Sequence, residues 1–341
     1  MGPAGGGHAP DMDDDARARI PRRAFVLGGG GALGAHEVGM LKALLAAGLR
    51  PDLVVGTSVG AINGAAVAAE PSAASIDRLA DLWTGLGRAG VFTGSLFGRL
   101  STAVRSGTHL YAPTPLRDLL VSHVPAARIE ELAVPFQCVA AGIEKAAEHW
   151  FTEGPLADAV LASCAVPGLL PPVEVDGEHF VDGGLVNSIP VARAVSLGAR
   201  EVWVLQVGRV ERPLRPPRLP WEVALVAFEI ARRHRFARDM ATMPPGVTVH
   251  LLPSGSAQEA QGTLGQLRYR TFGRTGQRIE AAYAASSRYL DTVLDAGGGT
   301  APQPAPPGDA ADDAPHPGTG SGPDSRPPDA GRGSGGGNGP A

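Results

Sequence analysis

The chain has 341 residues and a formal net charge of −4, and its two ends are rich in Gly and Pro. Residues 1–20 carry a charge of −2, while residues 297–341 carry −3 and contain no Leu, Ile, Val or Phe. Segments that bury so little apolar surface cannot offset the entropy of ordering, so we predict that both ends are disordered. The remaining residues, 21–296, carry +1, which excludes the strongly basic surface of a nucleic-acid-binding protein and leaves enough chain for one large α/β domain.

The two cysteines, Cys138 and Cys164, stand among small and apolar residues. This setting predicts reduced core thiols and therefore a reducing compartment. The sequence contains no run of about 18 uncharged apolar residues, and its first residues lack the basic and apolar pattern of a signal peptide. We therefore expect a cytoplasmic protein. Composition leaves the oligomeric state open.

Hydrophobic patterns divide residues 21–296 into alternating strands and helices. The predicted strands are 23–27, 53–55, 135–141, 149–151, 201–207 and 247–252, with a hairpin over 173–181 around a tight Asp-Gly turn. The first predicted helix carries Val38, Leu41, Leu44 and Leu45 on one face. The other predicted helices are 60–69, 75–84, 115–123, 155–163, 190–197, 221–239 and 275–294. The alternation predicts an α/β fold, a three-layer α/β/α sandwich with a mostly parallel central sheet.

The first candidate for chemistry is a serine on a turn between a strand and a helix. An apolar strand end is followed by Gly56-Thr57-Ser58-Val59-Gly60 and then by an alanine-rich helical pattern. In this context G-x-S-x-G exposes the serine hydroxyl at the carboxyl end of the strand. The free N–H groups at the start of the helix add the positive end of its dipole. The alternative is a Gly/Ser-rich turn without chemistry.

A second glycine-rich turn, Gly29 to Gly34, follows the first predicted strand with the pattern G-x-G-x-x-G. This pattern is typical of dinucleotide binding, which also requires an acidic residue at the carboxyl end of the second strand. Asp52 has nearly the right spacing but precedes its strand, so it lies at the wrong end of the sheet. We favour another use, because consecutive glycine amides at a helix start can stabilise the oxyanion of an acyl intermediate.

A serine nucleophile needs a base, and the sequence offers histidines and an aspartate. His234 stands in an arginine-rich helical run, His250 lies in a strand pattern and His316 lies in the C-terminal tail. None of the three has a motif around it. Asp182 ends an apolar strand and is followed by two glycines. An ordinary Asp-Gly turn is the alternative for that segment.

Three motifs, taken together and in this order, resemble the patatin-like phospholipase family. They are Gly29–Gly34, Gly56-Thr57-Ser58-Val59-Gly60 and Asp182-Gly183-Gly184. The segment Ala162 to Gly168, followed by Pro171-Pro172-Val173, also looks like the family's segment before its Asp-Gly-Gly, and Asn187 and Pro190 fall where the family has Asn and Pro. The resemblance covers residues 22–207 and continues more weakly to about residue 294.

The resemblance implies a lipid acyl ester hydrolase that works through an acyl-enzyme with Ser58 as nucleophile and Asp182 as base. It also implies that neither a metal nor a cofactor takes part. The implied oxyanion hole consists of Gly29, Gly30 and Gly31. The glycines that support the motifs are Gly34, Gly56, Gly60, Gly183 and Gly184. The implied substrate is a phospholipid, lysophospholipid or neutral lipid ester.

One departure and two other functions stay open at this point. Leu33 stands where the family often has Arg or Lys, which puts binding of charged head groups in question. An acyltransferase would use the same acyl-enzyme with an alcohol as acceptor. A non-catalytic module that binds nucleotides or membranes would use the glycine turns without the serine.

The sequences of two further segments indicate how the protein would bind a lipid chain and contact a membrane. Residues 85–108 mix glycines with bulky apolar residues, which favours loops and a mobile helix that form a wall of the acyl pocket. In the helix at 221–239, Trp221, Leu225, Phe228 and Phe236 recur at near-helical spacing beside Arg232, Arg235 and Arg238. This pattern predicts peripheral contact with a membrane surface. The alternative is a stripe packed on the sheet, with the arginines as its solvated face.

Overall fold

A computed structural model of the chain describes residues 23–88, 111–207, 214, 216–255 and 274–295, apart from the side chains of residues 220, 221, 224 and 225. The predicted tails, 1–20 and 297–341, lie outside these residues. So does most of the predicted pocket wall, residues 89–108. All described residues belong to one compact unit within residues 1–306.

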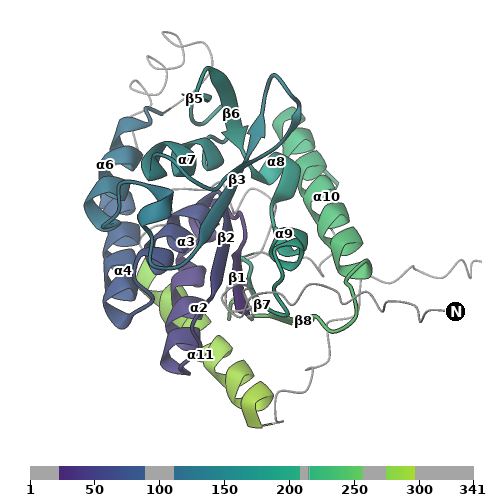
Figure 1. Cartoon of the computed structure of the whole chain (residues 1–341). Helices are drawn as coiled ribbons and strands as arrows, with labels where there is room; N and C mark the ends of the chain where they lie inside the picture. Colours follow the sequence, from purple (N-terminus) through teal and green to yellow (C-terminus); the bar gives the residue numbers. More distant parts are fainter. Residues whose placement is uncertain (1–22, 89–110, 208–213, 215, 256–273, 296–341) are drawn as a thin grey trace, which may run out of the picture. The chain divides into compact units, whose positions relative to one another are not determined.

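The centre of this unit is an eight-stranded sheet in the order β5-β6-β3-β2-β1-β7-β8, with β4 also paired to β3 (Figure 1). The parallel strands are β1 (Arg23–Leu27), β2 (Leu53–Thr57), β3 (Phe136–Gly142), β7 (Glu201–Leu205) and β8 (Thr248–Leu251). The antiparallel strands are β4 (Ala147–Phe151), β5 (Val173–Val175) and β6 (Glu178–Asp182). The predicted mostly parallel sheet is confirmed.

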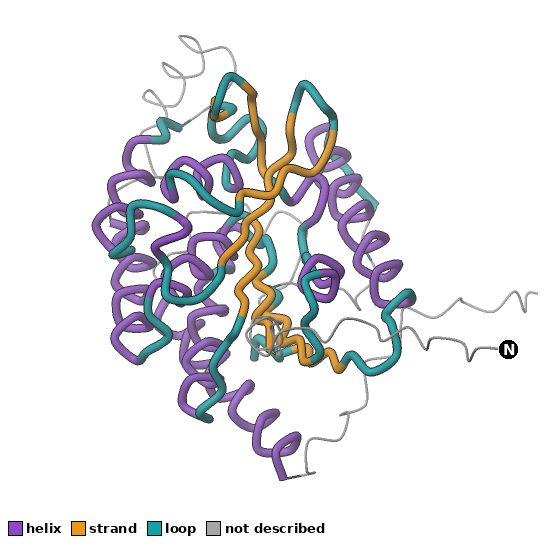
Figure 2. Tube along the Cα trace, viewed as in Figure 1, coloured by secondary structure: helices purple, strands orange, loops and turns teal. Residues whose placement is uncertain are grey.

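Helices cover both faces of the sheet, because its central strands are apolar on both sides (Figure 2). In β1, Phe25 and Leu27 enter one core, whereas Ala24 and Val26 enter another. The first core includes side chains of α2 (Ala35–Ala46), α3 (Val59–Ala69), α4 (Ala73–Arg88), α6 (Thr114–His123), α7 (Leu156–Ser163) and α11 (Thr275–Asp295). The second includes side chains of α9 (Val191–Ser196) and α10 (Pro220–Ala241). The three predicted layers are therefore present.

The parallel pairing of β1 and β2 brings the two glycine-rich turns to the same edge of the sheet. Leu27 pairs with Gly56, so the turns that follow both strands begin at the same level. Asp52 lies at the opposite edge, where it accepts a hydrogen bond from the Arg23 amide over 2.8 Å. Asp52 therefore cannot serve as the acidic residue of a dinucleotide site, because it lies at the other end of the strands from the glycine turns.

The differences from the predicted elements are local. Helix α4 continues to Arg88 and so extends past the predicted end at residue 84. The short helix α8 (Gly184–Asn187) and two 3₁₀ turns, Gly31–Leu33 and Ile129–Glu131, were not predicted. Elements of three or four residues are too short to show a hydrophobic period. The predicted Asp-Gly turn is present, with positive φ at Asp176 and Gly177.

Candidate active site

Ser58 occupies a strained turn between β2 and α3. Its φ of 54° and ψ of −123° define a backbone conformation that residues other than glycine rarely adopt. The turn is also crowded, since a Cβ at Gly60 would lie 2.3 Å from the Leu27 carbonyl oxygen. A Cβ at Gly56 would lie 2.5 Å from the Gly60 carbonyl oxygen. Glycine at both positions therefore lets α3 begin directly against the end of β1.

Asp182 lies against Ser58 although 124 residues separate them in the chain. The Ser58 hydroxyl donates a hydrogen bond to Oδ2 of Asp182 over 2.6 Å. The sheet creates this contact, because β3 pairs with β2 on one side and with β6 on the other, where Asp182 stands opposite Ala140. The Gly184 amide donates to Oδ1 of Asp182 over 2.7 Å, so both carboxyl oxygens have a donor.

Burial has the largest effect on the pKa of Asp182, which is only 4% exposed. Loss of hydration raises the pKa of the carboxyl from 3.8 to about 6, and the hydrogen bonds from Ser58 and Gly184 limit that rise. Asp182 is therefore mostly ionised at neutral pH. It can accept a proton there and is a stronger base than an exposed aspartate.

Ser163, which sequence reasoning did not single out, holds this pair in place. Its hydroxyl accepts a hydrogen bond from the Ser58 amide over 2.9 Å and donates one to the Val139 carbonyl over 2.7 Å. Its own carbonyl accepts from the Gly183 amide over 3.2 Å. The only signal in the sequence was its place in the small-residue segment between Ala162 and Gly168.

The first glycine turn lies beside Ser58, and its amides are not equivalent. Gly29 donates its amide to the Ser188 carbonyl over 2.9 Å. Among the described residues, the amides of Gly30 and Gly31 have no acceptor. Gly31 also lines the same pocket as Ser58. Two unused donors therefore lie in the turn next to the serine.

An apolar pocket opens beside the Ser58 hydroxyl. The larger side chains that line it include Ile62, Trp83, Leu86, Leu116, Leu169 and Leu170. Leu86 comes from the end of α4, the one part of the predicted wall at 85–108 that the structure describes. The pocket suits an apolar chain better than a charged group.

No histidine takes part in this arrangement within the described part of the chain. His234 is exposed on α10, and His250 is buried on β8 with its ring stacked on Trp203 at a centroid distance of 4.1 Å. His316 lies outside the described residues. Within the same ranges, no group of three or more His, Cys, Asp or Glu side chains could hold a metal ion.

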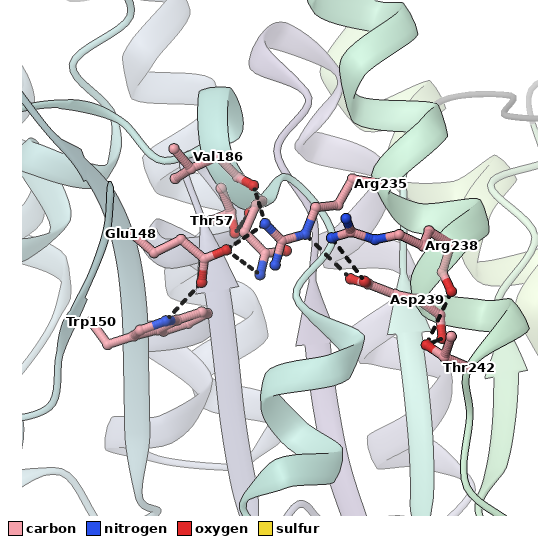
Figure 3. A network of polar contacts seen from close by, with 9 residues as sticks. Thr57, Glu148, Trp150, Val186, Arg235, Arg238, Asp239 and Thr242 are labelled. Carbon is pink, nitrogen blue, oxygen red and sulfur yellow. Dashed lines mark hydrogen bonds and ion pairs between the residues drawn. The ribbon is translucent and has the colours of Figure 1, made fainter. Parts of the chain in front are cut away.

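A polar network anchors the segment that follows Asp182 (Figure 3). Nη1 of Arg235, on α10, donates to the Val186 carbonyl of α8 over 2.9 Å and lies 2.6 Å from Oε1 of Glu148 on β4. The Thr57 hydroxyl donates to the Asn187 carbonyl over 2.8 Å. Helix α8 is therefore tied both to α10 and to the residue before Ser58.

Residues 25–195 match the family model described as patatin-like phospholipase, which spans just over half of the chain. The chain belongs to the patatin-like phospholipase family. Family membership supports lipid ester hydrolysis as the class of reaction. Among the described residues of this patatin-like chain, we find no helix with both the length and the hydropathy that crossing a bilayer requires.

Two relatives show how far the similarity extends. The chain is 34% identical over 187 residues to patatin-like phospholipase domain-containing protein 7 of Rattus norvegicus, and 32% identical over 194 residues to lysophospholipase nte1 of Aspergillus terreus. These stretches cover 54% and 55% of this chain but only 13% and 12% of the relatives. Among solved structures, VipD from Legionella pneumophila aligns with a TM-score of 0.37 and 13% identity, over 80% of this chain and 67% of VipD.

Proposed function

We propose that this patatin-like chain hydrolyses lipid acyl esters with Ser58 as nucleophile and Asp182 as base. The observation that carries the proposal is the 2.6 Å hydrogen bond from a strained serine to a buried carboxylate beside an apolar pocket. In this arrangement an acyl chain enters the pocket while the ester carbonyl lies against the Ser58 hydroxyl. The head group of the lipid stays outside the pocket.

The reaction has two balanced halves. As Ser58 Oγ bonds to the ester carbonyl carbon, its proton passes to Asp182, and the carbonyl oxygen becomes an oxyanion. When the oxyanion collapses, the bond to the alcohol oxygen breaks and Asp182 protonates that oxygen, which leaves an acyl-enzyme. Water then attacks the acyl carbon while Asp182 takes its proton, and Ser58 regains a proton as the carboxylic acid leaves.

We assign the oxyanion hole to the amides of Gly30 and Gly31. Gly29 was also put forward from the sequence, but its amide is already donated to Ser188, so we leave it out. The start of α3 adds the positive end of its dipole at the same place.

We also propose peripheral contact with a lipid surface, through a face of α10 that differs in part from the one expected from the sequence. Phe236 is buried in the second core, and Arg232 is buried in an ion pair with Glu229. The exposed face of α10 instead presents Val223 and Ile230, each 54% exposed. An apolar face of this kind can rest among lipid head groups.

A cytoplasmic location remains part of the proposal. Cys138 and Cys164 are both free and buried, and burial raises the pKa of each thiol. Reduced thiols of this kind suit a reducing compartment.

The decisive experiment compares wild type with Ser58→Ala on p-nitrophenyl esters of increasing chain length. Wild type should hydrolyse them and react with a serine-directed phosphonate, whereas Ser58→Ala should do neither while it keeps its circular dichroism spectrum. A Ser58→Ala protein that retains a substantial rate would contradict the assignment. Product analysis with an added alcohol would separate hydrolysis from acyl transfer.

A further inference from the structure

Glu37 is a fully buried carboxyl group just after the glycine turn, and the proposed chemistry does not use it. Its Oε2 accepts a hydrogen bond from Nδ2 of Asn63 over 2.8 Å. Among the described residues, Oε1 has no hydrogen-bond partner. Burial therefore raises the pKa of Glu37 well above 4.5, and the contacts with Asn63 and the Gly28 backbone lower it less.

Asn63, on α3, is the centre of the contacts around Glu37. Its Nδ2 donates to Oε2 of Glu37 and, over 3.0 Å, to the Gly34 carbonyl. Its Oδ1 accepts from Nε1 of Trp83 over 2.8 Å. An indole N–H can only donate, so this bond fixes which end of the Asn63 amide faces which partner. Both amide hydrogens of Asn63 are therefore used.

These three side chains join the parts of the site that must keep a fixed separation. Asn63 holds the last residue of the glycine turn, Gly34, and Glu37 lies close to Gly28, the residue just before the turn. Asn63 also belongs to the helix that begins directly after Ser58. The Trp83 ring lines the pocket and packs on Gly34, where a Cβ would lie 2.4 Å from the ring.

We propose that Glu37, Asn63 and Trp83 form a positioning network that sets the distance from the Gly30 and Gly31 amides to Ser58. The network rests on the proposed function, because it positions the proposed oxyanion hole. Neither Glu37 nor Asn63 lines the pocket, and their hydrogen bonds lead to the glycine turn, so we expect them to act through that turn. What Asn63 needs from residue 37 is an oxygen acceptor, and glutamine supplies one at the same length.

The test measures kcat and KM on a short p-nitrophenyl ester for wild type, Glu37→Gln, Glu37→Leu and Ser58→Ala. We expect Glu37→Leu to lower kcat by about 10- to 100-fold with little change in KM, because misplaced oxyanion donors act on the transition state. Glu37→Gln should stay within about threefold of wild type, since it keeps the acceptor for Asn63. Trp83→Phe serves as a second probe if Glu37→Leu does not fold, because it removes the N–H that Asn63 accepts and keeps an aromatic ring, though a smaller one. It should lower kcat in the same direction.

Each outcome decides the matter. A folded Glu37→Leu with wild-type kcat would overturn the network, and so would a Glu37→Gln as impaired as Glu37→Leu. If Glu37→Leu does not fold, an unchanged kcat in Trp83→Phe would overturn it. Equal rates for wild type and Ser58→Ala would overturn the proposed function itself, and the network with it.

Discussion

At the scale of single residues, the backbone of Ser58 is strained, and we attribute the presence of serine at this position to the reactivity of its hydroxyl. A φ of 54° with ψ of −123° costs a non-glycine residue about 1–3 kcal/mol, whereas glycine adopts it readily. We predict that Ser58→Gly unfolds with a free energy about 1 kcal/mol higher than Ser58→Ala, after allowance for the greater entropy of unfolded glycine. Urea denaturation of the two inactive variants measures the difference. A less stable glycine variant would show that the turn is unstrained.

The raised pKa of Asp182 predicts how activity depends on pH. The base must be ionised to take the proton of Ser58, and burial places its pKa at about 6. We therefore expect kcat/KM to be constant above neutral pH and to fall tenfold per unit well below pH 6. A pH series with a neutral ester measures this profile. An activity that stays constant down to pH 4 would exclude Asp182 as the base.

The same pKa shift predicts that the ionised form of Asp182, which activity requires, makes the folded state less stable. The folded pKa of about 6 exceeds the ordinary 3.8, so the folded state binds the proton more tightly, and its stability rises as pH falls through 6. The full effect is about 3 kcal/mol, because one pKa unit corresponds to about 1.4 kcal/mol. Asp182→Asn removes it and should be more stable than wild type at pH 8 but not at pH 4.

Thermal unfolding at both pH values tests the Asp182 effect, with Ser58→Ala as the control. Ser58→Ala keeps the buried carboxyl and should therefore keep the pH dependence. An Asp182→Asn protein with the same advantage at pH 4 and pH 8 would trace its stability to something other than the buried charge.

At the scale of elements, α10 clamps α8 through Arg235 (Figure 3). Arg235→Met removes the partner of the Val186 carbonyl and of Glu148, and Arg238→Met is the matched control, since Arg238 is 62% exposed and 4.0 Å from its carboxylate. We expect Arg235→Met to lower the free energy of unfolding by about 1–2 kcal/mol and Arg238→Met by less than about 0.5. Urea denaturation measures both. Equal losses would mean that the clamp contributes nothing specific.

At the scale of the whole molecule, the exposed face of α10 predicts how the protein meets lipid. Val223→Ser together with Ile230→Ser should weaken co-sedimentation with vesicles by about fivefold or more, because two apolar side chains leave the lipid interface. Val121→Ser on α6 is the control, since Val121 is equally apolar and also exposed. Equal binding by all three proteins would remove α10 from the contact. Loss of binding in Val121→Ser alone would move the contact to α6.

Arginines 232 and 235 show why sequence alone left the role of this helix open. Their spacing beside an apolar stripe is typical of a membrane-facing helix. The same spacing is equally compatible with arginines that form the solvated face of a packed helix. In the structure Arg232 pairs with Glu229 in the interior and Arg235 pairs with Glu148 from β4, which is 87 positions earlier. Helical periodicity reports which residues share a face, but the face that is buried depends on partners far away in the chain.

The sequence by itself determined the features that depend on near neighbours. Alternating apolar runs and helical patterns were enough for the parallel sheet and its covering helices, and the glycines around Ser58 were enough for the turn. Tertiary structure decided the rest. The pairing of Ser58 with Asp182 was implied only by the resemblance to a family, and no local pattern predicted it. That contact, the hydrogen bond from the Gly29 amide to Ser188 and the contacts of Glu37 with Asn63 all join separate segments. Hydrogen-bond partners and burial arise only when the sheet brings such segments together, so no local pattern encodes them.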